Sequence, residues 1–342
     1  MYAMIGGVDL SPFNFPRRRE AALIVGAGAS RGAHFVTPAT MCKPPLDTDF
    51  FTLLRSSGLG GESDAYRLLQ FVDREFGSLK VGMESFYSQA SLYDRFIHDI
   101  PIGGRGRRRE YRSNLASFRR MLPKLFATSL AGKLCRFHEQ LAFAAQPGDT
   151  FISFNYDCLL DRAIMKQCGR RWGADHGYGF TVTGGKADWQ DHAGKGRYPV
   201  RPVMLLKPHG SLNWRLEDKK ISLLSDEYAA RPESELVIVP PLWQKSFDDE
   251  PYQTVWTRTR KTLSSVKALF VVGYSLPETD VYTQATLRMD VGPLDFLCVV
   301  NPDKDARDRI ARTLRSAVRA STHYVEFERL ADLAGALPPA RP

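Results

Sequence analysis

The segment that decides the fold is Leu23-Ile24-Val25-Gly26-Ala27-Gly28-Ala29-Ser30. Its apolar start predicts a buried strand, and its small and polar end predicts a tight turn after that strand. Three later segments have the same form, an apolar run that stops at small or polar residues: Phe151-Ile152-Ser153-Phe154-Asn155-Tyr156-Asp157, Leu205-Leu206-Lys207-Pro208-His209-Gly210-Ser211 and Phe270-Val271-Val272-Gly273-Tyr274-Ser275-Leu276. Because ligands bind beyond the carboxyl ends of the strands in an open α/β sheet, the four turns predict one nucleotide-binding crevice.

Strand and helix patterns alternate around these segments, which predicts an α/β fold with a Rossmann-type parallel sheet. Residues 1–43 and 147–342 are assigned to the core that contains this sheet. Residues 44–146 carry apolar side chains at three- and four-residue spacing, which predicts an all-helical insertion or small subdomain. Within the insertion, the Gly- and Arg-rich stretch 103–112 is expected to be an exposed loop. Near the end of the core, a helix is expected over 303–320.

Charge is distributed unevenly along the 342 residues, whose formal net charge is +9. Arginines cluster at 17–19 and at 105–109, with a further one at Arg112. These clusters form either a solvated face or a surface for nucleic acid or an acidic partner protein. Aromatic residues do not alternate with the arginines, so stacking on single-stranded nucleic acid is not expected.

The five cysteines are widely spaced and include no CxxC pair. We therefore expect neither a metal site nor a disulfide framework, but buried thiols in a reducing cytoplasm. No long apolar stretch precedes Pro16, so a signal peptide is not expected. No apolar run reaches the roughly 18 residues that a membrane span needs.

The first turn offers residues for binding a phosphate. Gly26, Ala27 and Gly28 would allow the backbone to approach it closely, and Ser30 would add a hydroxyl donor. The sequence departs from GxGxxG because Arg31 stands in place of the third glycine. A simple tight turn is the alternative interpretation.

The second and third turns offer residues for chemistry. Asn155 would hold a ribose hydroxyl or a water, because its amide both donates and accepts; helix capping by Asn155 or Asp157 is the alternative. His209 is suited to proton transfer near neutral pH, and Asn155 at a neighbouring strand end favours a catalytic role over a structural one.

Later segments add further candidates. Gly273 and Ser275 would bind phosphate or ribose oxygens, and Asn301 would contact a ribose or an adenine edge. Glu84 is a further candidate, with a solvated helix charge as the alternative.

Taken together, these motifs resemble the Sir2-like domain in its bacterial antiphage-defence branch. The resemblance extends over about residues 20–330 and rests on the order and spacing of the turns around Gly26, Asn155, His209, Gly273 and Asn301-Pro302. It implies a Sir2-like, DHS-like NAD-binding fold with NAD+ as substrate. It also implies catalytic roles for Asn155, His209 and Asp157. The four-cysteine zinc module of the deacylases is missing, which argues against recognition of peptide lysines.

The resemblance implies an NAD+ glycohydrolase that cleaves NAD+ to nicotinamide and ADP-ribose and acts in antiphage defence by depleting NAD+. Control would come from homo-oligomerisation or from a partner such as a HerA-type ATPase. The alternatives are an NAD-dependent protein deacylase, a non-catalytic sensor of NAD or ADP-ribose, and a nucleic-acid-associated scaffold. The trigger, the partner and the choice between hydrolysis and cyclisation stay open.

Overall fold

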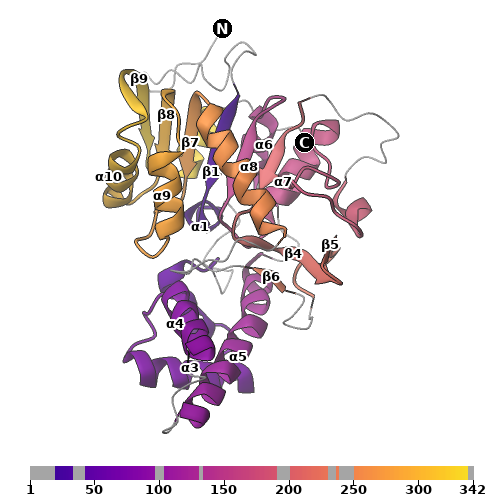
Figure 1. Ribbon diagram of the computed structural model, residues 1–342, viewed down its shortest axis with the longest axis vertical. Coiled ribbons are helices and arrows are strands. Elements are labelled where there is room, and N and C mark those ends of the chain that lie inside the picture. The colour runs from indigo at the N-terminus through magenta and orange to yellow at the C-terminus, as the bar shows by residue number, and fades with distance from the viewer. Residues whose placement is uncertain are drawn as a thin grey trace.

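The main sheet has six parallel strands in a Rossmann order (Figure 1). The computed structural model describes residues 20–33, 43–96, 104–130, 134–190, 201–229, 236–238 and 250–337. Across the sheet the strands are β3 (Met204–Leu206), β2 (Thr150–Ser153), β1 (Ala21–Val25), β7 (Ala268–Val272), β8 (Leu294–Val300) and β9 (Val318–Phe327). Counted along the main sheet alone, this is the order 3-2-1-4-5-6 of doubly wound dinucleotide-binding folds. The predicted α/β fold with a parallel sheet is confirmed.

The central strands bury both of their faces because helices cover both sides of the sheet. Leu23 and Val25 of β1 join the core on one face, and Ala22 and Ile24 join the core on the other. The first core includes residues of α6 (Arg136–Ala144), α7 (Leu159–Cys168) and α11 (Leu330–Gly335). The second includes residues of α8 (Tyr252–Ser265), α9 (Val281–Met289) and α10 (Lys304–Thr313).

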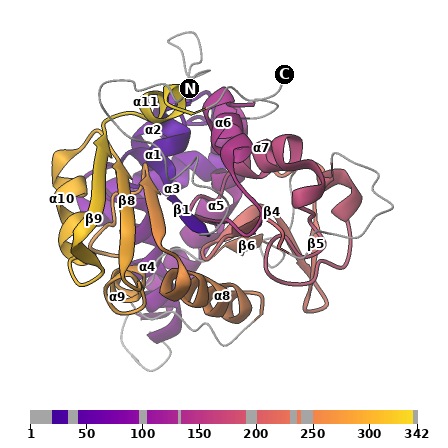
Figure 2. The same cartoon turned by 90° about the horizontal axis from the view of Figure 1, so that it is seen from above.

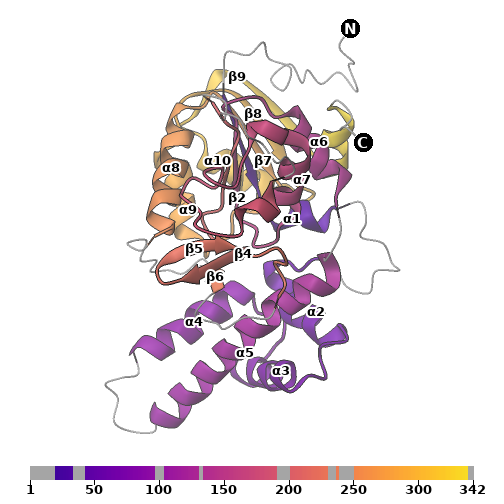
Figure 3. The ribbon, with the colours of Figure 1, turned by 90° about the vertical axis from the view of Figure 1, so that its right-hand side faces the viewer.

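A helical block lies below the main sheet in Figures 1 and 3. It comprises the short helix η1 (Asp47–Asp49) and α2 (Phe50–Ser56), α3 (Ser63–Phe76), α4 (Met83–Phe96) and α5 (Gly104–Leu130). Its core is aromatic: the rings of Phe50 and Phe118 lie 5.1 Å apart, and those of Phe86 and Phe118 lie 5.5 Å apart. The predicted division at residues 43/44 and 146/147 stays a prediction; α6, within the predicted insertion, packs against α7 beside the main sheet.

The expected exposed loop over 103–112 is wrong, because α5 begins at Gly104 and runs through this stretch. Arginine is a good helix former, and the helix buries Tyr111, Leu115 and Phe118 along one face. Both glycines of the described part of the stretch stand in the first turn of α5, where they cost the least.

The expected helix over 303–320 is also wrong beyond Thr313, because β9 begins at Val318. β9 lies at the outer edge of the sheet beside β8 (Figure 2). Most of its residues are exposed or half-buried, so it lacks the apolar run that marks a central strand.

A second sheet of three antiparallel strands was not predicted as a sheet. It consists of β5 (Lys220–Leu223), β4 (Gly210–Glu217) and β6 (Leu236–Ile238), and it lies between the main sheet and the helices α4 and α5 (Figure 3). Asp218 and Lys219 close the β4–β5 hairpin with φ angles of 47° and 60°. Two consecutive positive φ angles are typical of the tight hairpin turn.

Several expectations concern residues outside the described ranges, among them the arginines at 17–19, Cys42 and the stretch before Pro16. The four described cysteines, Cys135, Cys158, Cys168 and Cys298, are all buried and free. Among the helices that the structure describes, none is both long and apolar enough to cross a membrane.

Candidate active site

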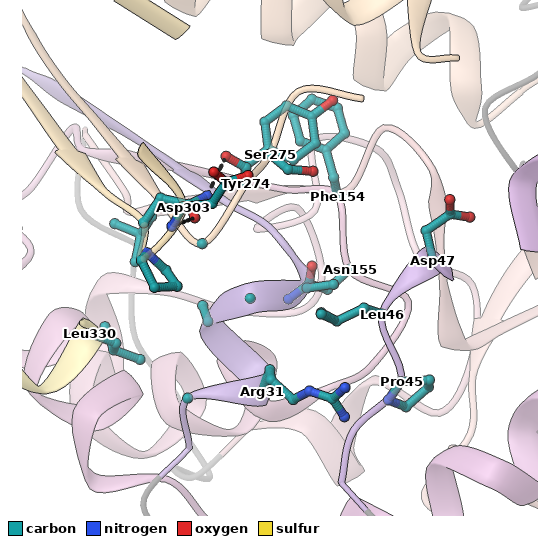
Figure 4. Close-up of a pocket in the computed structure, with 18 of the residues that line it drawn as sticks. Arg31, Pro45, Leu46, Asp47, Phe154, Asn155, Tyr274, Ser275, Asp303 and Leu330 are labelled. Atoms are coloured by element: carbon teal, nitrogen blue, oxygen red, sulfur yellow. Dashed lines mark hydrogen bonds between the residues drawn. The ribbon is translucent and has the colours of Figure 1, made fainter. Parts of the chain in front are cut away.

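A cavity of about 620 Å³ opens at the carboxyl edge of the main sheet (Figure 4). The turns after β1, β2, β3, β7 and β8 line one side, and the helical block lines the other with Pro45–Thr48, Met83 and Glu84. The chain connections leave the sheet in opposite directions from the neighbouring strands β1 and β7. The cavity therefore lies at the topological switch point, where doubly wound folds bind their ligands.

The glycines of the first turn allow two turns of backbone to pack directly against each other. A Cβ on Gly26 would lie 2.6 Å from Tyr274 Cα, and a Cβ on Gly28 would lie 2.8 Å from Gly273 O. Gly273 has a φ of 62°, and a Cβ there would lie 2.1 Å from the nitrogen of Ala29. Gly28 N–H donates to Gly273 O at 2.8 Å. The close contact between the two turns therefore requires these glycines, a role that the sequence pattern did not predict.

A hydrogen-bonded chain fixes the side chain of Asn155. Its Nδ2 donates to Ser30 Oγ and to Gly26 O, each at 3.1 Å. Ser30 Oγ in turn donates to Asp157 Oδ2 at 2.8 Å, and Asp157 Oδ1 accepts from Leu159 N at the start of α7. These contacts hold the amide of Asn155 in one orientation.

The other amide atom of Asn155, Oδ1, is buried and has no hydrogen-bond partner among the described residues. Asn155 as a whole is 6% exposed and lines the cavity. A buried acceptor without a partner is unfavourable by about 1–3 kcal/mol, so a ligand hydroxyl or a water that donates here would be stabilised.

His209 follows β3 and lines the same cavity as Asn155. Its Nε2 lies 3.4 Å from Oδ2 of Asp280, and its ring meets Phe154 edge-on at a centroid distance of 4.9 Å. Sequence reasoning missed Asp280. The residue type gave no signal beyond that of an N-cap, and the carboxylate of Asp280 does accept from Thr283 N at the start of α9.

The remaining predicted residues divide into two groups. Ala27, Gly28, Asp157, Gly273, Ser275 and Asn301 line the cavity, whereas Gly26 and Ser30 stand behind its described lining. Asn301 is buried and donates from Nδ2 to Tyr274 O at 3.2 Å, so it also holds the turn after β7.

Carboxylates reach the cavity from the helical block. Asp47 Oδ1 accepts from Glu84 N at 2.8 Å, and Glu84 Oε2 accepts from Thr279 Oγ1 at 3.0 Å. Burial raises the pKa of Asp47, although the hydrogen bond from Glu84 N opposes that shift. Arg31, in place of the third glycine, lines the cavity and pairs with Asp49 of the same block. Arg31 of α1 (Ala27–Arg31) and Thr279 of the turn after β7 therefore connect the helical block to the main sheet.

A buried ion pair supports the turn after β2. Lys207 Nζ donates to Asp157 O at 2.7 Å and to Asp161 Oδ2 at 2.9 Å, and both side chains of the ion pair are fully buried. Burial alone would lower the pKa of Lys207, but the Asp161 carboxylate and other neighbours raise it above its usual value. Lys207 is therefore charged and anchors the backbone of the turn that carries Asn155.

A family model described as the SIR2-like domain matches residues 149–315. The chain contains a SIR2-like domain. The matched range includes Asn155, Asp157, His209, Gly273 and Ser275, and the predicted resemblance is confirmed at the level of this domain.

Solved structures similar to this chain include several Sir2 proteins. A Sir2 homologue in complex with NAD has a TM-score of 0.46 at 12% identity, with 95% of this chain and 91% of that chain covered. A structure described under the mechanism and regulation of Sir2 enzymes has a TM-score of 0.45 at 12% identity, with 94% and 90% covered. A Sir2–p53 peptide–NAD+ complex has a TM-score of 0.39 at 13% identity, with 95% and 94% covered. No curated protein sequence matches this chain.

Proposed function

We propose that this protein is an NAD+ glycohydrolase that cleaves the nicotinamide–ribose bond of NAD+. One observation carries the proposal: Asn155, whose buried Oδ1 has no hydrogen-bond partner in the described part of the chain, lines the same switch-point cavity as His209. An acceptor fixed in place suits a ribose hydroxyl or an attacking water, and a neighbouring imidazole suits proton transfer.

The reaction requires little from the protein beyond positioning and proton transfer. The bond between ribose C1′ and the nicotinamide nitrogen breaks, and its electron pair neutralises the nicotinamide ring. The ribose passes through an oxocarbenium-like state, as in glycoside hydrolysis. A water oxygen then bonds to C1′ and gives up its proton, which His209 accepts. The products are nicotinamide, ADP-ribose and one proton.

Asn155 would hold the ribose hydroxyl or the water through Oδ1. Because Nδ2 is held by Ser30 and Gly26, the amide would not need to reorganise during the reaction. The turns that carry Gly28, Gly273 and Ser275 would contact the phosphate and ribose oxygens of the dinucleotide, and Asn301 would contact the adenosine end.

For the cellular role, we propose antiphage defence in the cytoplasm through depletion of NAD+. Constant hydrolysis of NAD+ would kill the host, so activity would be controlled by homo-oligomerisation or by a partner such as a HerA-type ATPase. The arginines on α5 would offer a surface for such a partner or for nucleic acid; Arg107, Arg109 and Arg112 are exposed there.

The test is to incubate the purified chain with NAD+ and to separate the products by chromatography, with and without proteins encoded beside it. We expect nicotinamide and ADP-ribose in equal amounts. Turnover only with an acyl-lysine peptide would indicate a deacylase instead. Binding of NAD+ without any product, under all of these conditions, would indicate a sensor.

A further inference from the structure

The carboxylate of Asp280 is buried behind the cavity, where several polar groups contact it. Asp280 is 0% exposed and His209 is 3% exposed. Oδ2 of Asp280 accepts from Tyr274 Oη at 2.7 Å and lies 3.4 Å from His209 Nε2. Oδ1 accepts from Thr283 N at 3.4 Å, where Asp280 caps α9.

Aromatic rings hold the imidazole on its other sides. Phe154 stacks on Tyr274 at a centroid distance of 4.7 Å and meets His209 edge-on at 4.9 Å. Trp256 of α8 lies 6.4 Å from the imidazole, centroid to centroid. His209, Asp280, Tyr274 and Phe154 therefore form a closed ring of contacts built from three separate segments of the chain.

Helix capping alone does not explain the burial of Asp280. Asp303 caps α10 in the same way, accepting from Asp305 N at 2.9 Å, and its cap is exposed. A buried carboxylate is costly unless neighbouring groups stabilise its charge. The contacts with His209 and Tyr274 provide that stabilisation, which links the carboxylate to the residue that lines the cavity.

We propose that Asp280 is a positioning residue that orients His209 and raises its affinity for a proton. The inference rests on the proposed function only in taking His209 as the proton acceptor. A neutral histidine that donates from Nε2 carries its basic lone pair on Nδ1, so the contact with Asp280 selects one tautomer. After His209 accepts a proton, the carboxylate stabilises the resulting imidazolium.

Other titratable groups lie around His209 and Asp280, and their contacts or positions differ from those of Asp280. Burial raises the pKa of Tyr274 and Tyr156 well above the usual range, so both phenols stay neutral at physiological pH. Lys207, two residues before His209, is paired with Asp161. Glu84 of α4 and Asp47 of η1 approach from the helical block, and Asp157 from the turn after β2; all three carboxylates line the cavity. Removal of Asp280 therefore takes away the carboxylate in contact with Nε2 and leaves the others in place.

The first experiment is an NMR titration of histidine ring signals without NAD+, with the His209 signal assigned by His209→Ala. We expect Asp280→Asn to weaken the proton affinity of His209 about tenfold or more. Asp280→Glu keeps the charge, and we expect it to stay within about threefold of the native protein. The matched control is Asp149→Asn, which alters a buried carboxylate that accepts from Ala21 N and Gln146 N at the opposite end of β1 and β2; it is expected to change the proton affinity of His209 less than twofold.

The second experiment measures the pH dependence of NAD+ cleavage. We expect Asp280→Asn to lower kcat about a hundredfold, to change KM less than threefold, and to move the acidic limb of the profile to lower pH. An unchanged His209 titration in folded Asp280→Asn overturns the inference. A tenfold loss of His209 proton affinity in Asp280→Glu, which keeps the carboxylate, overturns it as well. This second outcome serves as the test if Asp280→Asn does not fold. If the native protein cleaves no NAD+ while Asp280→Asn still weakens the proton affinity of His209, the proposed function fails and the pairing stands.

Discussion

The hydroxyl of Ser30 donates to Oδ2 of Asp157 at 2.8 Å, across 127 positions of the chain. This bond joins the turn after β1 to the turn after β2, and the same hydroxyl accepts from Asn155 Nδ2. Asp157 also accepts from Leu159 N at the start of α7. These contacts are those of a positioning residue, whereas the predicted catalytic role of Asp157 stays a prediction.

Asn155→Ala and His209→Ala are each expected to reduce NAD+ cleavage at least about a hundredfold, because one removes the fixed acceptor and the other the proton acceptor. Product chromatography gives the rate, and circular dichroism and thermal melting report the fold. Asn114→Ala on α5 and His323→Ala on β9 are matched controls outside the cavity lining, with rates expected within about twofold of the native protein. A folded variant of either site residue with near-native turnover would refute its assignment.

Gly273→Ala is expected to lower the free energy of unfolding by about 1–3 kcal/mol or more, because the new Cβ would collide with the nitrogen of Ala29 and the φ angle of 62° disfavours a side chain. Urea denaturation measures the change. Gly58→Ala is the control, since no atom lies within 4 Å of its added Cβ, and we expect less than about 0.5 kcal/mol. Equal stability of the two variants would show that the two turns do not pack as described.

Lys207→Met is expected to lower the free energy of unfolding by about 3–5 kcal/mol, because it leaves the fully buried Asp161 carboxylate without its cation. The control is Lys304→Met, which removes an exposed pair with Asp308 and should leave the free energy of unfolding nearly unchanged. The comparison uses urea denaturation of both variants. A loss at Lys207 no greater than that at Lys304 would mean that the buried pair does not hold the turn.

Metal analysis of the purified protein is expected to find less than about a tenth of a zinc ion per chain, because the cysteines lack paired spacing. Burial raises the pKa of Cys158 and of Cys298 and raises that of Cys168 to about 12, so these thiols hold their protons and are poor metal ligands. Stoichiometric zinc would contradict this expectation and would revive the deacylase alternative.

The isolated chain is expected to be weakly active, with specific activity that rises on self-association or on addition of a partner protein. Light scattering and activity assays over a wide range of dilution test this together. The helical block and the arginines at the start of α5 are the surfaces we expect to make the contact. A monomer with full activity at every dilution, unchanged by a partner, would leave the block only the role of covering the cavity.

The apolar pattern of the sequence was sufficient to predict four strands of the main sheet and the turns that follow them. β1 and β7 are continuous apolar runs because both of their faces are buried, and β2 and β3 carry shorter apolar stretches; each ends where the backbone leaves the sheet. The positions of Asn155 and His209 at two of these ends follow from that pattern. The apolar spacing of residues 44–146 was sufficient to predict that this part of the chain is helical, because side-chain burial sets the period.

The residues that stand behind those strand ends depend on how the chain folds and could not be read from local sequence. The edge strand β9 has no apolar run because most of its residues are exposed or half-buried, and α5 begins within a stretch whose composition resembles a loop. The contact of Asp280 with His209 joins residues 71 positions apart, and the packing of Gly28 on Gly273 joins residues 245 positions apart. Local spacing carries no record of such contacts, because they arise when the parallel strands bring distant turns to one edge of the sheet.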